Sequence, residues 1–316
     1  MAPISHLLSN DHAEQRLNRA PIPPLFHFIL YNRNLSHPAF LCSLEAAIRS
    51  NPDVQVVLYT ADPFELHASA NASTYWSSAI FSKRLWIKRL DHKHMFKGTP
   101  LEGWFNQRWH TFSHWIDQNL SNAFRLAALW RHGGIYLDMD IISVRPFPLG
   151  HRLLVLEDES LINNAVMAFP PKDPFVAHMI EEFINRFNGW NWAENGPYAV
   201  TRTFRQQCLA AQNASDPLTT WDGQYPPGVD PSCHGLVITR NQSFYPVHWS
   251  DSRLFIQPAA QHCRHMEAIH HNSIGVHWWH KGFENDTLLP SESVLGTLFH
   301  NHCPRLVEVF GWDGIL

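Results

Sequence analysis

Two acidic residues, Asp138 and Asp140, stand one residue apart near the centre of the chain, directly after the apolar run 135–137. In an extended backbone, side chains two positions apart point to the same side, so these carboxylates would lie next to each other. At about 6–7 Å their repulsion amounts to about 2–3 kcal/mol for an effective dielectric of 20, and a divalent cation would reverse that cost. Oxygen ligands favour Mg²⁺ or Mn²⁺ over zinc. The pair therefore predicts a metal site with coordination positions left for a diphosphate.

The acidic pair is expected at the end of a strand that follows a helix. Residues 122–131 carry packing side chains at helical spacing, with Ser121 as the expected N-cap and the glycine pair 133–134 as the stop. The apolar runs before and after the pair predict strands. An isolated Asp-x-Asp is common in turns, but the carboxyl end of a sheet strand is where α/β proteins bind ligands.

The same helix offers further polar groups. Asn122 and Arg125 are three residues apart and therefore share a helix face, where an amide and a guanidinium could bind sugar hydroxyls or phosphate.

The surrounding chain alternates strand and helix patterns, which predicts the α/β class. The opening reads as strand 25–31, a helix from Pro38 and strand 54–60, a unit that favours parallel pairing with a right-handed crossover. A third strand is expected at 85–90. Further elements are a helix that begins at Asp173-Pro174, a short helix after Pro197 and a strand at 275–279.

Composition bounds the remaining possibilities. The chain has 316 residues, 45% of them hydrophobic, which is enough for one large domain or two packed halves. The net charge of -4, without a basic stripe, argues against a nucleic-acid partner. The histidine groups 92/94 and 262/265/270/271 lack the paired cysteines of zinc sites and are expected on the surface.

Cysteines and glycosylation sequons bear on the compartment. The five cysteines form no CxxC pair, and Cys208–Cys233 or Cys233–Cys263 could form disulfides. Sequons at Asn34, Asn71, Asn119, Asn213, Asn241 and Asn285 favour a secretory lumen. Residues 1–20 are polar, without an apolar run for a signal peptide or membrane helix, so any membrane association would require an N-terminal anchor missing from this sequence.

A series of motifs resembles the DXD-containing glycosyltransferases of family 32, and within them the α-1,4-glycosyltransferases that include globotriaosylceramide synthase. The central match is the segment 120–140, Leu-Ser-Asn-Ala-Phe-Arg through Leu-Asp-Met-Asp. Other segments follow in the order of the family, and the resemblance covers roughly residues 24–281: 40–47, 96–104, 163–169, 187–190, 195–197, 244–249 and 276–278.

The resemblance implies a GT-A type nucleotide-diphospho-sugar transferase fold, with a Rossmann-like mixed sheet flanked by helices. After a polar tail at 1–20, a single domain would span 21–316, with a nucleotide-sugar-binding half at 21–145 and an acceptor-binding half at 146–316. It further implies retaining transfer from a UDP-sugar, with galactose or N-acetylglucosamine favoured, to a glycan or glycolipid through an α-1,4 linkage. The expected location is the Golgi membrane, with a lumenal catalytic domain.

The resemblance also implies roles for single residues. Asp138 and Asp140 would bind Mn²⁺ or Mg²⁺ and the diphosphate, with His277 as a candidate third ligand. Asn122, Arg125, Asp138 and His280 would contact the donor, and Asn164 and Asn195 would lie near the reacting sugars as members of the catalytic site with both aspartates.

Two departures qualify this assignment. Asn122 stands where many members have Asp, and His280 where Asn is usual, which alters the expected donor contacts. Glu157, Asp158 and Glu194 are only positional candidates for a nucleophile, so same-face attack assisted by the leaving diphosphate is preferred. The alternatives are a catalytically inactive carbohydrate-binding relative and a phosphohydrolase of the haloacid-dehalogenase type, which places Asp-x-Asp similarly but carries Gly or Thr where Ile142 stands.

Overall fold

The computed structural model describes residues 21–31, 38–61, 63, 70–78, 81, 83–209, 235–282 and 290–312. The chain forms two compact units that are interleaved along the sequence. Unit 1 contains residues up to 27 together with 91–136 and 149–240, and unit 2 contains 28–90, 137–148 and 241–316. In the described parts of the chain, no helix is both long and apolar enough to cross a membrane.

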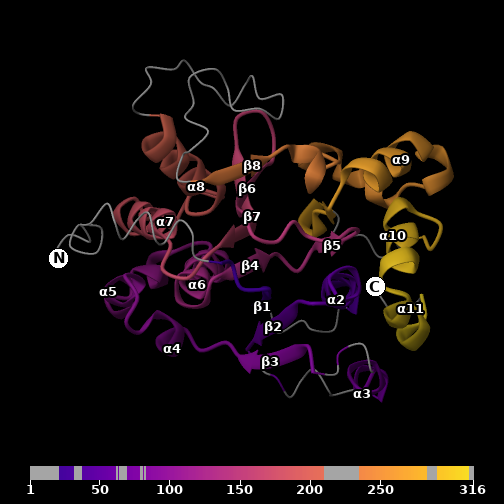
Figure 1. The fold of residues 1–316 in the computed structure, drawn as a ribbon, viewed down its shortest axis with the longest axis horizontal. Coiled ribbons are helices and arrows are strands. Elements are labelled where there is room, and N and C mark those ends of the chain that lie inside the picture. Colours follow the sequence, from indigo (N-terminus) through magenta and orange to yellow (C-terminus); the bar gives the residue numbers. More distant parts are fainter. Residues whose placement is uncertain are drawn as a thin grey trace. The chain divides into compact units, whose positions relative to one another are not determined.

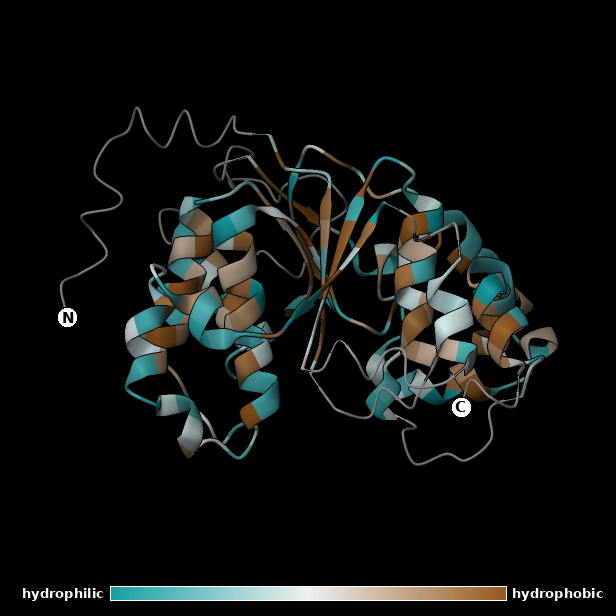
Figure 2. Ribbon diagram, turned by 90° about the horizontal axis from the view of Figure 1, so that it is seen from below, coloured by the Kyte–Doolittle hydropathy of each residue, from teal (hydrophilic) through white to brown (hydrophobic). Residues whose placement is uncertain are grey.

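The main sheet has the strand order β3-β2-β1-β4-β7-β6-β8. Parallel pairing joins β2 to β3, β1 to β4 and β6 to β8, whereas β6 and β7 are antiparallel. Apolar residues fill the strands, and Figure 2 shows them largely brown beside helices that combine brown and teal faces. The expected α/β class with a mixed, mostly parallel sheet flanked by helices is confirmed. The strands are β1 (Leu25–Leu30), β2 (Gln55–Thr60), β3 (Leu85–Arg89), β4 (Gly134–Leu137), β6 (Arg152–Leu156), β7 (Ile162–Phe169) and β8 (Leu236–Thr239).

Unit 1 packs its helices through apolar faces, and a buried ion pair fixes the start of one of them. Asp173 caps α7 by accepting a hydrogen bond from the Phe175 N–H, and it also pairs with Arg152 at 2.6 Å. The predicted cap at Asp173 is therefore confirmed. The helices of this unit are α4 (His92–Phe96), α5 (Leu101–Asn106), α6 (Ile116–His132), α7 (Pro174–Asn185) and α8 (Pro197–Phe204), with a 3₁₀ turn at Trp109–Phe112 (Figure 1).

Helix α6 is longer than the sequence predicts. It begins at Ile116 after Trp115, so Ser121 lies inside the helix and the expected N-cap is wrong. The reason is that Asn119 and Leu120, directly before Ser121, are already buried in the helix, which starts five residues before Ser121. The predicted stop is correct, because Gly133 has a φ of 62° and Gly134 a φ of 100°.

Unit 2 gathers the end of the chain around α2. Figure 1 shows α10 and α11 in yellow, and both contact α2. A short second sheet pairs β5 with β9 in antiparallel register. The unit contains α2 (Leu41–Ser50), α3 (Ala70–Trp76), β5 (Ile141–Ser143), a 3₁₀ helix at Trp249–Ile256, α9 (Cys263–Asn272), β9 (Gly275–His277), α10 (Val294–His302) and α11 (Pro304–Phe310).

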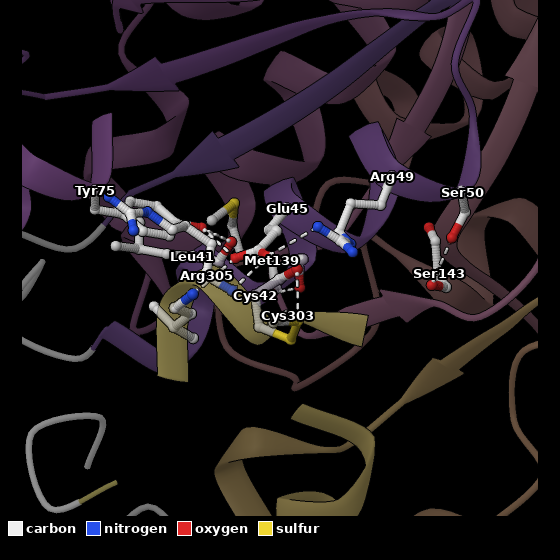
Figure 3. Close-up of a disulfide and its surroundings, with 12 residues drawn as sticks. Leu41, Cys42, Glu45, Arg49, Ser50, Tyr75, Met139, Ser143, Cys303 and Arg305 are labelled. Carbon is white, nitrogen blue, oxygen red and sulfur yellow. Dashed lines mark hydrogen bonds and ion pairs between the residues drawn. A yellow bond between two sulfur atoms is a disulfide. The ribbon is translucent and has the colours of Figure 1, made fainter. Parts of the chain in front are cut away.

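A disulfide and a buried carboxylate attach the C-terminal helices to α2. Cys42 is bonded to Cys303, and the Glu45 carboxylate accepts hydrogen bonds of 2.9 Å from the backbone N–H groups of Arg305 and Leu306. Figure 3 shows this disulfide beside Glu45, Tyr75 and Arg305. Burial raises the Glu45 pKa, although its hydrogen bonds and Arg49 oppose that effect.

The remaining cysteines and the sequons correct two expectations. Cys263 is a free, exposed thiol, so a Cys233–Cys263 bridge is wrong. Cys208 is disulfide-bonded, but Cys233, its expected partner, lies outside the described residues. Asn119 is buried and hydrogen-bonded, which excludes it as an acceptor in the folded chain, whereas Asn71 and Asn241 are exposed. The other sequons, at Asn34, Asn213 and Asn285, lie outside the described residues.

Candidate metal and nucleotide site

Asp138 and Asp140 lie in a tight turn between β4 and β5, with Met139 buried between them. The Ile141 N–H donates to the Asp138 carbonyl at 3.1 Å, which closes the turn. The predicted extended backbone is therefore wrong at this point, because the chain must turn from β4 to enter the second sheet. Both carboxylates nevertheless have oxygen atoms within 4.8 Å of each other and of a histidine nitrogen.

That histidine is His277, the last residue of β9. The antiparallel register pairs Ile141 with His277, so β9 places the imidazole next to the residue that follows the acidic pair. The His277 Nε2 atom lies 3.1 Å from the Asp140 Oδ1 atom. The structure thus brings together the three residues that the sequence proposed as metal ligands.

The segment after β9 binds Asp140 through its backbone. The Trp278 N–H donates to the Asp140 carbonyl at 3.0 Å, and the His280 N–H donates to Oδ2 at 3.3 Å. Trp279 between them has a φ of 52°, a left-handed conformation that a bulky residue rarely adopts, and its indole N–H is bound to the Val247 carbonyl at 2.7 Å. His280 therefore contacts the acidic pair with its main chain, while its ring lies edge-on to Phe40.

Electrostatics favour a charged Asp140. Burial alone would raise its pKa, but the charge and hydrogen bond of His277, followed by His280, lower it below the usual value. An ionised carboxylate beside an imidazole, with a second carboxylate close by, is a ligand set for a divalent cation. The set has both oxygen and nitrogen ligands, whereas Mg²⁺ prefers oxygen ligands and water.

Helix α2 contributes two contacts that the sequence did not reveal. The Ser43 hydroxyl donates to the Met139 carbonyl at 2.6 Å, and the Phe40 ring, just before the helix, contacts the rings of Trp278 and His280. These residues precede the turn by almost a hundred positions. No local pattern indicates such a contact, although the segment 40–47 belongs to the motif series noted above.

The predicted donor residues Asn122, Arg125 and Asn164 form a second group, within unit 1. The Arg125 guanidinium donates to the Asn164 carbonyl at 2.9 Å and to the Ser121 hydroxyl at 3.1 Å, and it lies 4.4 Å from the centre of the Tyr136 ring. Asn164 donates to the Asn122 side chain at 2.8 Å. Arg125 is only 6% exposed, so its contacts are mainly within the protein.

Asn195 lies in a neighbouring loop and is also buried. Its amide donates to Asn119 at 2.9 Å and to the Asn188 carbonyl at 2.6 Å, and its oxygen accepts from the Asn188 N–H. A Cβ added to Gly196 would lie 3.1 Å from the Asn164 side chain, so the loop passes very close to Asn164. The contacts of Asn195 indicate a positioning role in this loop.

The carboxylates considered as nucleophiles are engaged in the fold. Glu157 is buried and accepts from the Asn163 amide at 2.6 Å, and Asp158 accepts from Ser160 and from the Leu161 N–H. Glu194 pairs with Arg202 at 2.5 Å. Each of the three therefore has a structural task.

Two family profiles match successive parts of the chain. The profile "Glycosyltransferase sugar-binding region containing DXD motif" matches residues 38–165, and "Alpha 1,4-glycosyltransferase conserved region" matches residues 168–310. The chain is 28% identical to lactosylceramide 4-alpha-galactosyltransferase of Mus musculus, with 88% of this chain and 74% of the relative covered. It is 27% identical to alpha-1,4-N-acetylglucosaminyltransferase of Homo sapiens, with 84% and 74% covered.

Among solved structures, PaToxG glycosyltransferase matches with a TM-score of 0.46 and 20% identity over 62% of this chain and 72% of that one. The family assignment rests on the sequence matches. The two profiles follow one another over residues 38–165 and 168–310, and the mouse relative matches 88% of the chain. The chain belongs to the DXD-containing α-1,4-glycosyltransferase family and is a glycosyltransferase.

Proposed function

We propose that this protein transfers galactose or N-acetylglucosamine from a UDP-sugar to a glycan or glycolipid, with retention and through an α-1,4 linkage. The names of its relatives support this choice, since one is an α-1,4-galactosyltransferase that acts on lactosylceramide and another an α-1,4-N-acetylglucosaminyltransferase. The observation that carries the proposal is the group Asp138, Asp140 and His277, whose ligand atoms lie within 4.8 Å of one another. Membership of the family removes the phosphohydrolase alternative.

Asp138, Asp140 and His277 would hold Mn²⁺ in this proposal. The ion supplies positive charge that stabilises the diphosphate as it leaves. The His280 and Trp278 N–H groups orient Asp140, and Ser43 fixes the carbonyl between the two carboxylates. These contacts hold the ligands in place before the donor binds, so little reorganisation is needed.

The residues of unit 1 have supporting tasks in the same proposal. Asn122 and Asn164 present amides for the hydroxyl groups of the sugars. Arg125 would act on donor binding through Asn164, whose carbonyl it holds. Because Glu157, Asp158 and Glu194 have structural partners, the proposed route is attack on the same face from which UDP departs, without a protein nucleophile.

The compartment belongs to the proposal as well. A Golgi lumen suits the chain, because disulfides persist in oxidising compartments and Cys42 and Cys303 are bonded. Exposed sequons at Asn71 and Asn241 fit the same location. Sensitivity of the expressed protein to an N-glycosidase tests this, and a fully unglycosylated protein in a secretory host would contradict it.

The decisive experiment measures UDP release and sugar transfer with a panel of UDP-sugars, with and without Mn²⁺. Asp138→Asn and Asp140→Asn each remove one anionic ligand and should lower turnover at least about a hundredfold, or about 2.7 kcal/mol. Asp53→Asn, at an exposed aspartate, is the matched control and should be fully active. Full activity in either site variant, or sugar binding without UDP release in the wild type, would contradict the proposed enzyme.

A further inference from the structure

Two loops of unit 1 carry aromatic rings that the fold leaves exposed. Phe112 is 68% exposed, Trp190 73% and Trp192 48%. Half-buried Trp115 connects the loops, because its ring lies edge-on to Trp192 at 4.7 Å and its indole N–H donates to the Trp190 carbonyl at 3.1 Å. We call Phe112, Trp115, Trp190 and Trp192 the aromatic platform.

Backbone contacts press the two loops of the platform together. The His114 N–H donates to the Gly189 carbonyl at 2.8 Å, and the Ser113 hydroxyl donates to the same oxygen at 3.1 Å. A Cβ at Gly189 would lie 2.5 Å from the Phe112 carbonyl oxygen, so only glycine permits this approach.

A network of amides fixes the loop 188–195 from the other side. The Asn188 side chain accepts from the N–H groups of Trp190 and Asn191, and Asn195 binds both Asn188 and the α6 residue Asn119. Asn119 in turn donates to the Ser113 hydroxyl at 2.9 Å, which joins the two loops again. Polar contacts, not burial of the rings, therefore hold the platform in one conformation.

Exposed rings in a fixed loop indicate a binding surface. These side chains expose apolar surface to water, and a ligand that covers them removes that surface from water at a gain in free energy. Because the loop is already ordered, a ligand that stacks on the rings would not lose affinity by ordering it. Aromatic rings also bring large contact area with few rotatable bonds.

The chemistry around the rings favours a sugar. Indole faces can stack on the C–H patches of pyranose rings, and the flanking polar residues are the neutral amides Asn188 and Asn191 with Glu194. Segments 109–115 and 188–198 contain no Lys or Arg, the residues that attract an anionic membrane surface; exposed Arg108 stands directly before the first segment, and Glu194 is paired with Arg202. We propose that the aromatic platform binds the sugar chain of the acceptor by stacking on Trp190 and Trp192.

Direct binding tests the platform without any turnover. The full chain is applied to an immobilised array of oligosaccharides that includes lactose-terminated and N-acetylglucosamine-terminated chains, without nucleotide. Wild type should bind a defined set, and Trp190→Ala and Trp192→Ala should each weaken that binding about tenfold, which corresponds to about 1.4 kcal/mol. The matched control is Trp86→Ala, a tryptophan that is 49% exposed on β3.

Several results would overturn the proposal. These are no binding to any oligosaccharide, equal binding by wild type and both platform variants, or an equal loss in Trp86→Ala. Platform-dependent binding to phosphatidylcholine vesicles, with no oligosaccharide bound, would assign the surface to a membrane instead.

Kinetics assign the bound sugar to the acceptor, and this step alone rests on the proposed function. Trp190→Ala should raise the KM for acceptor about tenfold while leaving the KM for UDP-sugar and the rate of donor hydrolysis unchanged. A raised donor KM, or an unchanged acceptor KM, would contradict the acceptor assignment. If no UDP-sugar is used at all, the proposed function fails, yet platform-dependent binding on the array would still establish a glycan site.

Discussion

Ser43 on α2 donates a hydrogen bond to the main-chain carbonyl of Met139, with 2.6 Å between the oxygens. Both residues are buried, and Met139 separates the two carboxylates of the DXD turn. Cys42, the residue before Ser43, and Glu45 on the same helix attach α2 to the C-terminal helices. One helix thus connects the disulfide, the C-terminal helices and the backbone of the proposed metal site.

Ser43→Ala should weaken metal use as well as the fold. Loss of this hydrogen bond leaves a buried carbonyl with one partner fewer, at a cost of about 1–3 kcal/mol, and lets the turn relax. We expect the Mn²⁺ concentration for half-maximal activity to rise about threefold to tenfold. The control is Ser50→Ala on the same helix, whose hydroxyl donates to the Ser143 carbonyl at 3.1 Å. Equal metal titrations for the two variants would show that Ser43 has only a structural role.

His277→Ala tests whether the third side chain holds the ion. Removal of the imidazole leaves two carboxylates, a ligand set suited to Mg²⁺ as much as to Mn²⁺. Mn²⁺ affinity, measured by calorimetry, should fall about tenfold or more, which is about 1.4 kcal/mol, while the preference for Mn²⁺ over Mg²⁺ shrinks. His271→Ala at an exposed histidine is the control. Unchanged affinity and preference would remove His277 from the metal site.

The parts of the fold that follow from local patterns were predicted well. Apolar runs indicated β1, β2, β3 and β4, and Asp173 before Pro174 indicated the start of α7. The acidic pair was recognisable because an apolar strand ends immediately before it. The predicted start of α6 was wrong because the helix begins, and is already buried, before Ser121, a residue type that often caps helices.

Contacts between distant segments could not be read from the sequence. Ser43 and Met139 are 96 positions apart, and Cys42 and Cys303 are 261 apart, so spacing rules gave no reason to pair them. Asn119 stands in a glycosylation sequon, but tertiary packing buries its side chain, which is hydrogen-bonded to Asn195. His277 was proposed as a ligand through resemblance alone, and the register of β5 with β9 gives the physical reason for its position.

The Cys42–Cys303 disulfide should contribute strongly to stability. It closes a loop of 261 residues in the unfolded chain, and removal of native disulfides costs about 2–5 kcal/mol. We expect the double variant Cys42→Ala/Cys303→Ala to unfold at lower urea concentration and to lose protection of α11 in hydrogen exchange first. Cys263→Ala, at a free exposed thiol, should change the free energy of unfolding by less than about 0.5 kcal/mol. A double variant as stable as this control would refute the prediction.

His92 should make unit 1 sensitive to acid. Its ring lies among Phe96, Phe105 and Phe124, with centroids 5.8–6.0 Å from theirs, so His92 is half-buried and not the fully exposed surface histidine that was expected. Burial, together with the nearby charge of His110 and against the opposing effect of Asp91, lowers the His92 pKa from 6.5 to about 4.

The sign of the effect follows from this depressed pKa. Between pH 6.5 and about 4 the unfolded chain binds a proton at His92 that the folded chain excludes. The free energy of unfolding therefore keeps its full value above pH 6.5 and decreases as the pH is lowered from 6.5 to about 4. A pKa difference of about 2.5 units, at 1.36 kcal/mol per unit, lowers the free energy of unfolding by about 3 kcal/mol.

His92→Phe keeps an aromatic ring among the phenyl groups and cannot titrate. Its free energy of unfolding, measured in urea at several pH values, should therefore decrease less between pH 6.5 and 4 than that of wild type. His94→Phe, at an exposed position two residues away, should keep the wild-type slope, and an identical slope in all three proteins would show that His92 is not the acid-sensitive group.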